Sequence, residues 1–84
     1  MRVIISPAAA RDVGRLSPAV ADRIIAALRS LRDNPRPRGC LLLRRRRPPT
    51  WRLRVGDWRV LYEINDSDGV VTITGVRRRT KAYR

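Results

Sequence analysis

The 84-residue sequence contains no histidine and a single cysteine, Cys40. One cysteine excludes an internal disulfide and a cysteine-rich metal site. Without histidine, the chain also lacks the usual ligands of a structural zinc and an imidazole general base. The sequence has neither a glycine-rich phosphate loop nor a pair of carboxylates at a spacing suited to acid–base catalysis. We therefore expect no metal and no small-molecule cofactor.

Long apolar runs are also missing. No stretch approaches the roughly 20 apolar residues of a membrane-spanning helix. The apolar residues near the start end at Pro7, which leaves a run too short for the apolar region of a signal peptide. The sequence therefore predicts a cytoplasmic protein that does not span a membrane. Its length fits one small domain, residues 1–84, with a core near the lower limit for independent stability.

Positive charge is abundant. Twenty basic residues against seven acidic ones give a net charge of +13, and nineteen of the twenty are arginine. Such an excess favours a polyanionic partner: nucleic acid, an acidic protein or an anionic membrane surface. Arginine in preference to lysine suits bidentate contacts with phosphate and stacking on bases.

The segment Trp51–Ile64 has the pattern of a β-hairpin. Its residues alternate in character on both sides of Gly56–Asp57, a two-residue turn with glycine in the first position. Closing the ladder at this turn places Arg54 opposite Arg59 and separates two faces. One face is predicted to join the core and carries Trp51, Leu53, Val55, Trp58, Val60 and Tyr62. The other face carries Arg52, Arg54, Arg59 and Leu61.

The pairing of Arg54 with Arg59 opposes folding, because like charges directly across a sheet destabilise it by up to about 1 kcal/mol. One interpretation is that water screens the charges on an exposed face. The other is that Arg52, Arg54 and Arg59 converge on a bound anion. Convergence of three arginines on one rigid face favours the anion site.

The remaining segments complete an α+β pattern. Ser6–Pro7 and Ser17–Pro18 each provide a capping oxygen followed by a proline, which is typical of helix starts. The predicted elements besides the hairpin are a strand at Arg2–Ile5, helices at Ala8–Arg15 and Pro18–Asp33, and a strand at Val70–Thr74. Together they predict a strand, two helices and a three-stranded antiparallel meander, with the helices packed on one face of a four-stranded sheet.

Two basic segments lie outside these elements. The proline-rich stretch 36–50 contains a run of four arginines: Arg44, Arg45, Arg46 and Arg47. This run is either a solvated loop or a flexible arm that follows RNA phosphates, and the sequence leaves both open. The C-terminal segment also carries basic residues: Arg77, Arg78, Arg79 and Lys81. It is either a frayed tail or an extension of the arginine cluster.

The motif Arg-Val-Gly-Asp-Trp-Arg-Val-Leu-Tyr at 54–62, together with Arg79 and Tyr83 near the C-terminus, resembles the RelE/ParE toxin superfamily. The resemblance covers nearly the whole chain. It implies a RelE-like α+β fold and a toxin of a type II toxin–antitoxin system. RelE-like members enter the ribosomal A site and cut messenger RNA without a metal, whereas ParE-like members inhibit DNA gyrase.

Matched by position, the resemblance implies the catalytic residues Arg52, Arg54, Arg59, Arg79 and Tyr83. Arg52 and Arg59 are expected to hold the scissile phosphate, and Arg79 to stabilise the leaving oxygen. Tyr83 is expected to stack on a base or to transfer a proton. Further RNA contacts are expected from Arg44, Arg45, Arg46, Arg47, Arg77, Arg78 and Lys81.

The identity of a general base stays open. Relatives with strong ribonuclease activity often have lysine where this chain has Arg52 and Arg54. Arginine keeps its proton and is a poor base. The base is then Tyr83, Glu63, a water molecule or missing.

The function predicted from the sequence is a ribosome-dependent messenger RNA endoribonuclease that inhibits translation. Its expected partners are the ribosome, messenger RNA and a cognate acidic antitoxin, with no membrane and no cofactor. Two alternatives remain. One is a ParE-like toxin that inhibits gyrase without cutting RNA, and the other is a small basic RNA-binding module.

Overall fold

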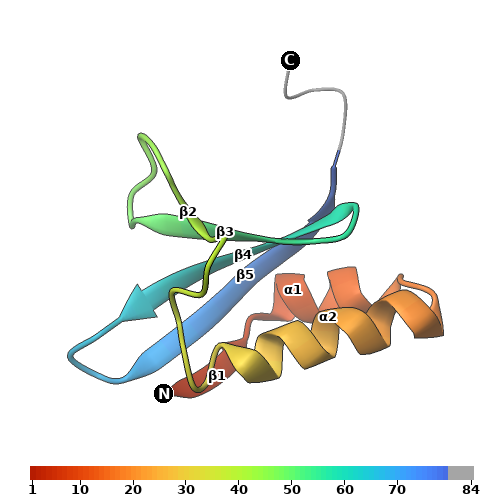
Figure 1. Cartoon of the computed structure of the whole chain (residues 1–84), viewed down its shortest axis with the longest axis horizontal. Helices are drawn as coiled ribbons and strands as arrows, with labels where there is room; N and C mark the ends of the chain where they lie inside the picture. Colours follow the sequence, from red (N-terminus) through yellow and green to blue (C-terminus); the bar gives the residue numbers. More distant parts are fainter. Residues whose placement is uncertain (80–84) are drawn as a thin grey trace.

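A computed structural model of the chain describes residues 1–79 and contains two helices and one mixed sheet of five strands (Figure 1). The elements in chain order are β1 Arg2–Ile5, α1 Pro7–Gly14, α2 Pro18–Ser30, β2 Leu41–Leu43, β3 Thr50–Val55, β4 Trp58–Asn65 and β5 Val70–Arg78. The strand order across the sheet is β1-β5-β4-β3-β2. Strand β1 runs parallel to β5, and every other pair is antiparallel. Both helices cover the same face of the sheet (Figure 1), so the predicted α+β fold class is confirmed.

The predicted number of strands was wrong by one. Residues Leu41–Leu43, in the stretch expected to be irregular, form the short strand β2 and pair with β3. The prolines around them limit β2 to three residues, too few to show an alternating pattern. What makes β2 a strand is the free edge of β3, which supplies the hydrogen-bonding partners. The Arg44–Arg47 run therefore lies in the loop that joins β2 to β3.

Both helices begin at the proline of a Ser-Pro pair: α1 begins one residue before the predicted Ala8, and α2 begins at Pro18, although the Ser17 side chain forms no capping hydrogen bond. The Ser6 side chain accepts a hydrogen bond from the Ala9 backbone N–H at 3.1 Å, and Pro7 occupies the first helical position. Helix α2 begins at Pro18 but ends at Ser30, three residues before the predicted end. Leu31 follows the helix and is still fully buried. None of the helices within residues 1–79 has the length and apolar character to cross a membrane.

The core lies between the helices and the sheet. Its buried hydrophobic residues are Ala9, Ile24, Leu28, Leu31, Val60, Tyr62, Val71, Ile73 and Val76. The predicted apolar face of the hairpin supplies Val60 and Tyr62 to this core, and its other members pack against it partly buried. Because the two helices pack against this face, the arginines of the hairpin lie on the opposite face, which the helices do not cover.

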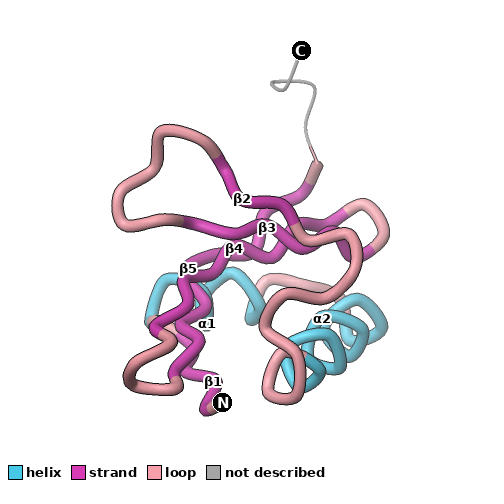
Figure 2. The backbone as a smooth tube through the Cα atoms, turned by 60° about the vertical axis from the view of Figure 1, so that its left-hand side comes forward, coloured by secondary structure: helices cyan, strands magenta, loops and turns pink. Residues whose placement is uncertain are grey.

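The loop after α2 runs from the helices to the sheet (Figure 2), and side chains hold it against the sheet. The Tyr62 hydroxyl donates a hydrogen bond to the Pro35 carbonyl oxygen at 2.8 Å. The Arg36 guanidinium lies 5.3 Å from the Trp51 ring centroid and forms an ion pair with Asp66 at 2.8 Å. These contacts fix the position of the loop that connects α2 to β2 at the edge of the sheet.

Tyr62 leads to a prediction on pH dependence. Its side chain is fully buried, and this burial raises the pKa of the phenol well above its ordinary value near 10. The folded state therefore binds this proton more tightly than the unfolded state does. The contribution of Tyr62 to the free energy of unfolding is therefore fully present below about pH 10 and is lost progressively as the pH rises above that value.

We expect Tyr62 to resist alkaline titration in the native protein. In a Tyr83→Phe variant Tyr62 is the one remaining tyrosine, so ultraviolet absorbance of tyrosinate reports on it alone. The absorbance should appear only well above pH 10 and together with unfolding, whereas the urea-denatured variant should titrate near pH 10. A native titration near pH 10 with the circular dichroism unchanged would contradict the buried, hydrogen-bonded phenol.

Candidate functional site

The predicted register of the hairpin is confirmed. Arg54 pairs with Arg59, and Arg52 pairs with Leu61. Strand β5 then places Arg77 opposite Arg59. Arg54, Arg59 and Arg77 therefore form a row across three adjacent strands, and Arg52 lies two residues away along β3. We call Arg52, Arg54, Arg59 and Arg77 the arginine face, on the side of the sheet that the helices leave open.

A β-bulge brings Arg77 to this face. Leu61 pairs with Gly75 while Tyr62 pairs with Ile73, so Thr74 is an extra residue in β5. One extra residue exchanges the two faces of a strand beyond it. As a result Val76 is buried in the core and Arg77 joins the arginine face. Without the bulge, the same alternation would have turned Arg77 toward the helices.

Burial distinguishes this face from an ordinary solvated surface. The Arg59 side chain lies mid-sheet and is only 8% exposed. Arg52 is half-buried, and its buried Nε atom has no hydrogen-bond partner within residues 1–79. Arg54 is exposed and donates from Nε to the Gly56 carbonyl oxygen at 3.3 Å. Water reaches the Arg59 side chain little, so the middle of the arginine face differs from an ordinary solvated surface.

Arg77 is held at the edge of the face by Asp12 of α1. The two side chains form an ion pair of 2.5 Å between Nη1 and Oδ2. The same carboxylate oxygen accepts a hydrogen bond from the Val76 backbone N–H at 2.9 Å, on the part of β5 that β1 does not cover. Gly75 makes room for this arrangement, because a Cβ atom there would lie 3.2 Å from Arg77 Nη1. The role of Asp12 could not be predicted from the sequence, since no local signal links it to a residue 65 positions away.

The other predicted site residues are more scattered. Arg79 is exposed, and its backbone N–H donates to the Asp57 carbonyl oxygen at 2.7 Å, which holds it beside the β3–β4 turn. Arg78 pairs with Trp58 on the helix-facing side and so does not join the arginine face. Arg44–Arg47 are exposed in the β2–β3 loop. Tyr83 and Lys81 lie outside the described residues.

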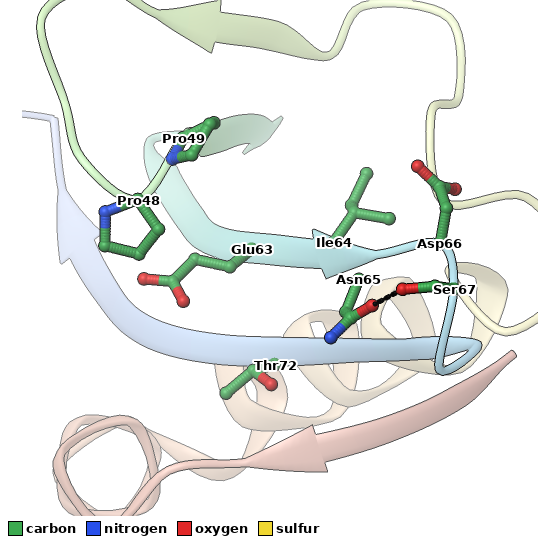
Figure 3. A pocket seen from close by; sticks show the side chains of 8 residues that line it. All are labelled: Pro48, Pro49, Glu63, Ile64, Asn65, Asp66, Ser67 and Thr72. Atoms are coloured by element: carbon green, nitrogen blue, oxygen red, sulfur yellow. Dashed lines mark hydrogen bonds between the residues drawn. The ribbon is translucent and has the colours of Figure 1, made fainter.

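Glu63 lines a separate cleft at the far end of β4. The cleft has a volume of about 570 Å³, and Figure 3 shows the Glu63 carboxylate beneath Pro48, with Thr72 across from it on β5. Glu63 is four residues from Arg59 along the strand, which corresponds to about 13 Å. A phosphate bound at the row of Arg54, Arg59 and Arg77 would be out of its reach. Arg52, by contrast, pairs with Leu61, which is two residues from Glu63, so Glu63 stays a candidate base for a phosphate held by Arg52.

The arginine face can bind and stabilise negative charge. Its guanidiniums are permanently charged and present several N–H donors in a fixed geometry, which matches phosphate oxygens. Within residues 1–79 no group of acidic, cysteine or histidine side chains has the arrangement of a metal site. What the face can do chemically is electrostatic: it can hold a phosphodiester and stabilise charge that develops on it.

Comparison with known proteins identifies the family. The family model "ParE toxin of type II toxin-antitoxin system, parDE" matches residues 3–83. This chain belongs to the RelE/ParE toxin superfamily. A search of curated protein sequences finds no match.

Solved RelE structures agree with this assignment. The archaeal RelE–RelB complex from Pyrococcus horikoshii OT3 shares 27% identity with a TM-score of 0.83, and the match covers 95% of this chain and 96% of that one. The RelBE2 toxin–antitoxin complex from Mycobacterium tuberculosis shares 30% identity with a TM-score of 0.80, over 93% and 96% of the two chains. The isolated E. coli RelE toxin has the same fold at 19% identity and a TM-score of 0.75, over 98% and 89%.

Proposed function

We propose that this RelE/ParE toxin is a RelE-like endoribonuclease that acts in the cytoplasm and cuts messenger RNA in the ribosomal A site without a metal. The observation that carries the proposal is the row of Arg54, Arg59 and Arg77 across three strands, with the Arg59 side chain buried in the middle. A protein selected only for stability has no reason to align like charges in this way. A phosphodiester in contact with the row would add negative charge beside that of Asp12, which already pairs with Arg77.

The proposed reaction is attack of a ribose 2′-hydroxyl oxygen on the adjacent phosphorus. The bond from phosphorus to the 5′ oxygen breaks, which leaves a 2′,3′-cyclic phosphate and a 5′-hydroxyl. Negative charge develops on the non-bridging oxygens, where Arg52 and Arg59 would stabilise it, and on the leaving oxygen, where Arg79 would do so. A well-placed donor of this kind contributes about 3–4 kcal/mol to transition-state stabilisation.

The reaction also moves one proton from the 2′-hydroxyl to the leaving oxygen. Arginine cannot accept it. In this proposal Tyr83, Glu63 or a water molecule carries the proton. Ribosomal RNA and messenger phosphates would be bound by the loop arginines Arg44–Arg47, and such binding weakens steeply with salt because counterions are released.

The proposed partner that restrains the toxin is a cognate antitoxin. The similar toxins from Pyrococcus horikoshii and Mycobacterium tuberculosis were solved as complexes with their antitoxins. With a net charge of +13, this chain would favour an antitoxin with an acidic segment that lies over the arginine face.

A second candidate function is inhibition of DNA gyrase without RNA cleavage. It is favoured by the family model itself, which describes the ParE toxin. One experiment separates the two functions. Purified toxin should cut messenger on programmed ribosomes, as mapped by primer extension, and should leave both free messenger and gyrase-driven supercoiling unaffected. Intact messenger together with inhibited supercoiling would overturn the RelE-like proposal in favour of the ParE-like one.

A further inference from the structure

A second basic cleft lies on the helix side of the sheet, away from the arginine face. It is bounded by the α1–α2 junction and by the β3–β4 turn, which lies above that junction in Figure 1. Its volume is about 500 Å³. Neither the proposed cleavage chemistry nor the packing of the core accounts for the arginines that line it.

Three arginines from three different elements surround this cleft. They are Arg15 after α1, Arg23 in α2 and Arg78 at the end of β5. Within residues 1–79 none of their guanidiniums forms an ion pair. Arg23 lies against the turn, with its Nη2 atom 2.7 Å from where a Cβ atom of Gly56 would stand. Among the described residues Asp57 is the one carboxylate that lines the cleft, so these residues leave an excess of positive charge there.

Apart from Ser17, the remaining wall of the cleft is apolar. Leu16, Val20 and Trp58 line it, and all three are partly buried against the core. An indole and two aliphatic side chains offer a flat apolar surface beside the guanidiniums. Aromatic surfaces combined with arginines are the usual elements of single-stranded nucleic-acid sites, because bases stack while phosphates are neutralised.

Strand β5 links the cleft to the arginine face. Beyond the bulge, Arg77 points to the arginine face and the next residue, Arg78, points into the cleft. Their Cα atoms are adjacent in the chain, about 3.8 Å apart. An RNA strand that leaves the arginine face around the Gly56–Asp57 turn would therefore meet the cleft within a short run of nucleotides.

We propose that this helix-side cleft binds a nucleotide of single-stranded RNA, with its phosphate on Arg15, Arg23 and Arg78 and its base against Trp58. The link to the messenger strand rests on the proposed function, but binding by the cleft does not. An acidic peptide is the competing occupant. We favour RNA because the cleft shares a strand end with the arginine face and presents an aromatic surface to a planar base.

The first test uses Trp58 as the reporter. A Trp51→Phe variant retains Trp58 as the sole tryptophan. Titration with a short oligouridylate at low salt should quench its fluorescence saturably, and an abasic oligonucleotide of the same length should quench it much less. An acidic peptide is the third ligand. Quenching by the peptide and not by the oligouridylate would overturn the proposal, as would no response to either.

The second test measures the charge requirement. Arg15→Gln combined with Arg23→Gln should weaken oligouridylate binding by about tenfold and reduce the salt dependence by about two counterions. The matched control is Arg11→Gln combined with Arg29→Gln, which removes the same charge from the same part of the chain at exposed positions outside the cleft. The control should bind within about twofold of the parent. Equal losses in both double variants would show general electrostatics and overturn the cleft assignment.

The outcomes separate this proposal from the proposed function. If the parent toxin cuts messenger and the cleft variant binds RNA as well as the parent does, the cleft proposal is wrong and the nuclease proposal stands. A parent that leaves messenger intact on ribosomes, with RNA binding that depends on Arg15 and Arg23, refutes the nuclease proposal and supports the cleft.

Discussion

Replacement of Arg59 by methionine is expected to lower messenger cleavage on ribosomes by about 10²–10³-fold and to remove most growth inhibition. The buried guanidinium lies in the middle of the row, between Arg54 and Arg77. A phosphate bound there would have positively charged side chains from three strands around it. Methionine is chosen because it fills a comparable volume with an unbranched, flexible side chain. At 8% exposure, truncation to alanine would leave a gap and confuse loss of function with loss of stability.

The matched control is Arg11→Met, which removes one arginine from an exposed position on α1. It should cut messenger at the parental rate. Thermal unfolding of both variants shows whether they fold, and ribosome sedimentation shows whether they bind. An Arg59→Met protein that is folded, binds ribosomes and is fully toxic would remove the arginine face from the mechanism. The ParE-like function would then be the better explanation of toxicity.

Ile73→Ala is expected to destabilise the fold by about 2–5 kcal/mol, the usual cost of removing a large buried aliphatic side chain. Ile73 is fully buried in β5 and pairs with Ile5 of β1 on one side and Tyr62 of β4 on the other. A small domain has a total stability of only about 5–15 kcal/mol, so this loss is a large fraction of the whole. Urea denaturation followed by circular dichroism measures it.

Thr72→Ala is the control for Ile73→Ala. Thr72 is the preceding residue, on the other face of the same strand, where it lines the Glu63 cleft. Its replacement should change the free energy of unfolding by no more than about 1 kcal/mol. If Ile73→Ala unfolds at the same urea concentration as Thr72→Ala, the core does not depend on β5 in the way the structure indicates.

The sequence by itself determined the local features of this protein. The register of the β3–β4 hairpin follows from side-chain alternation and from the Gly56–Asp57 turn, which are both encoded within fourteen residues, 51–64. This local pattern predicted the pairing of Arg54 with Arg59 correctly, because the pairing does not depend on contacts with residues far away in the sequence. The signals for the helix starts at Pro7 and Pro18 are also local, since each consists of a serine followed by a proline in the first helical turn.

Only the tertiary structure decided which other groups join the site. The bulge at Thr74 sends Arg77 to the arginine face and Arg78 to the helix-side cleft, and one unpaired residue is invisible in the alternation of a strand. Asp12 reaches Arg77 through the packing of α1 beside β5, and β2 forms because β3 leaves an edge open. Each of these depends on contacts between segments far apart in the chain. Propensity and periodicity describe neighbours along the sequence, whereas the site is assembled by neighbours in space.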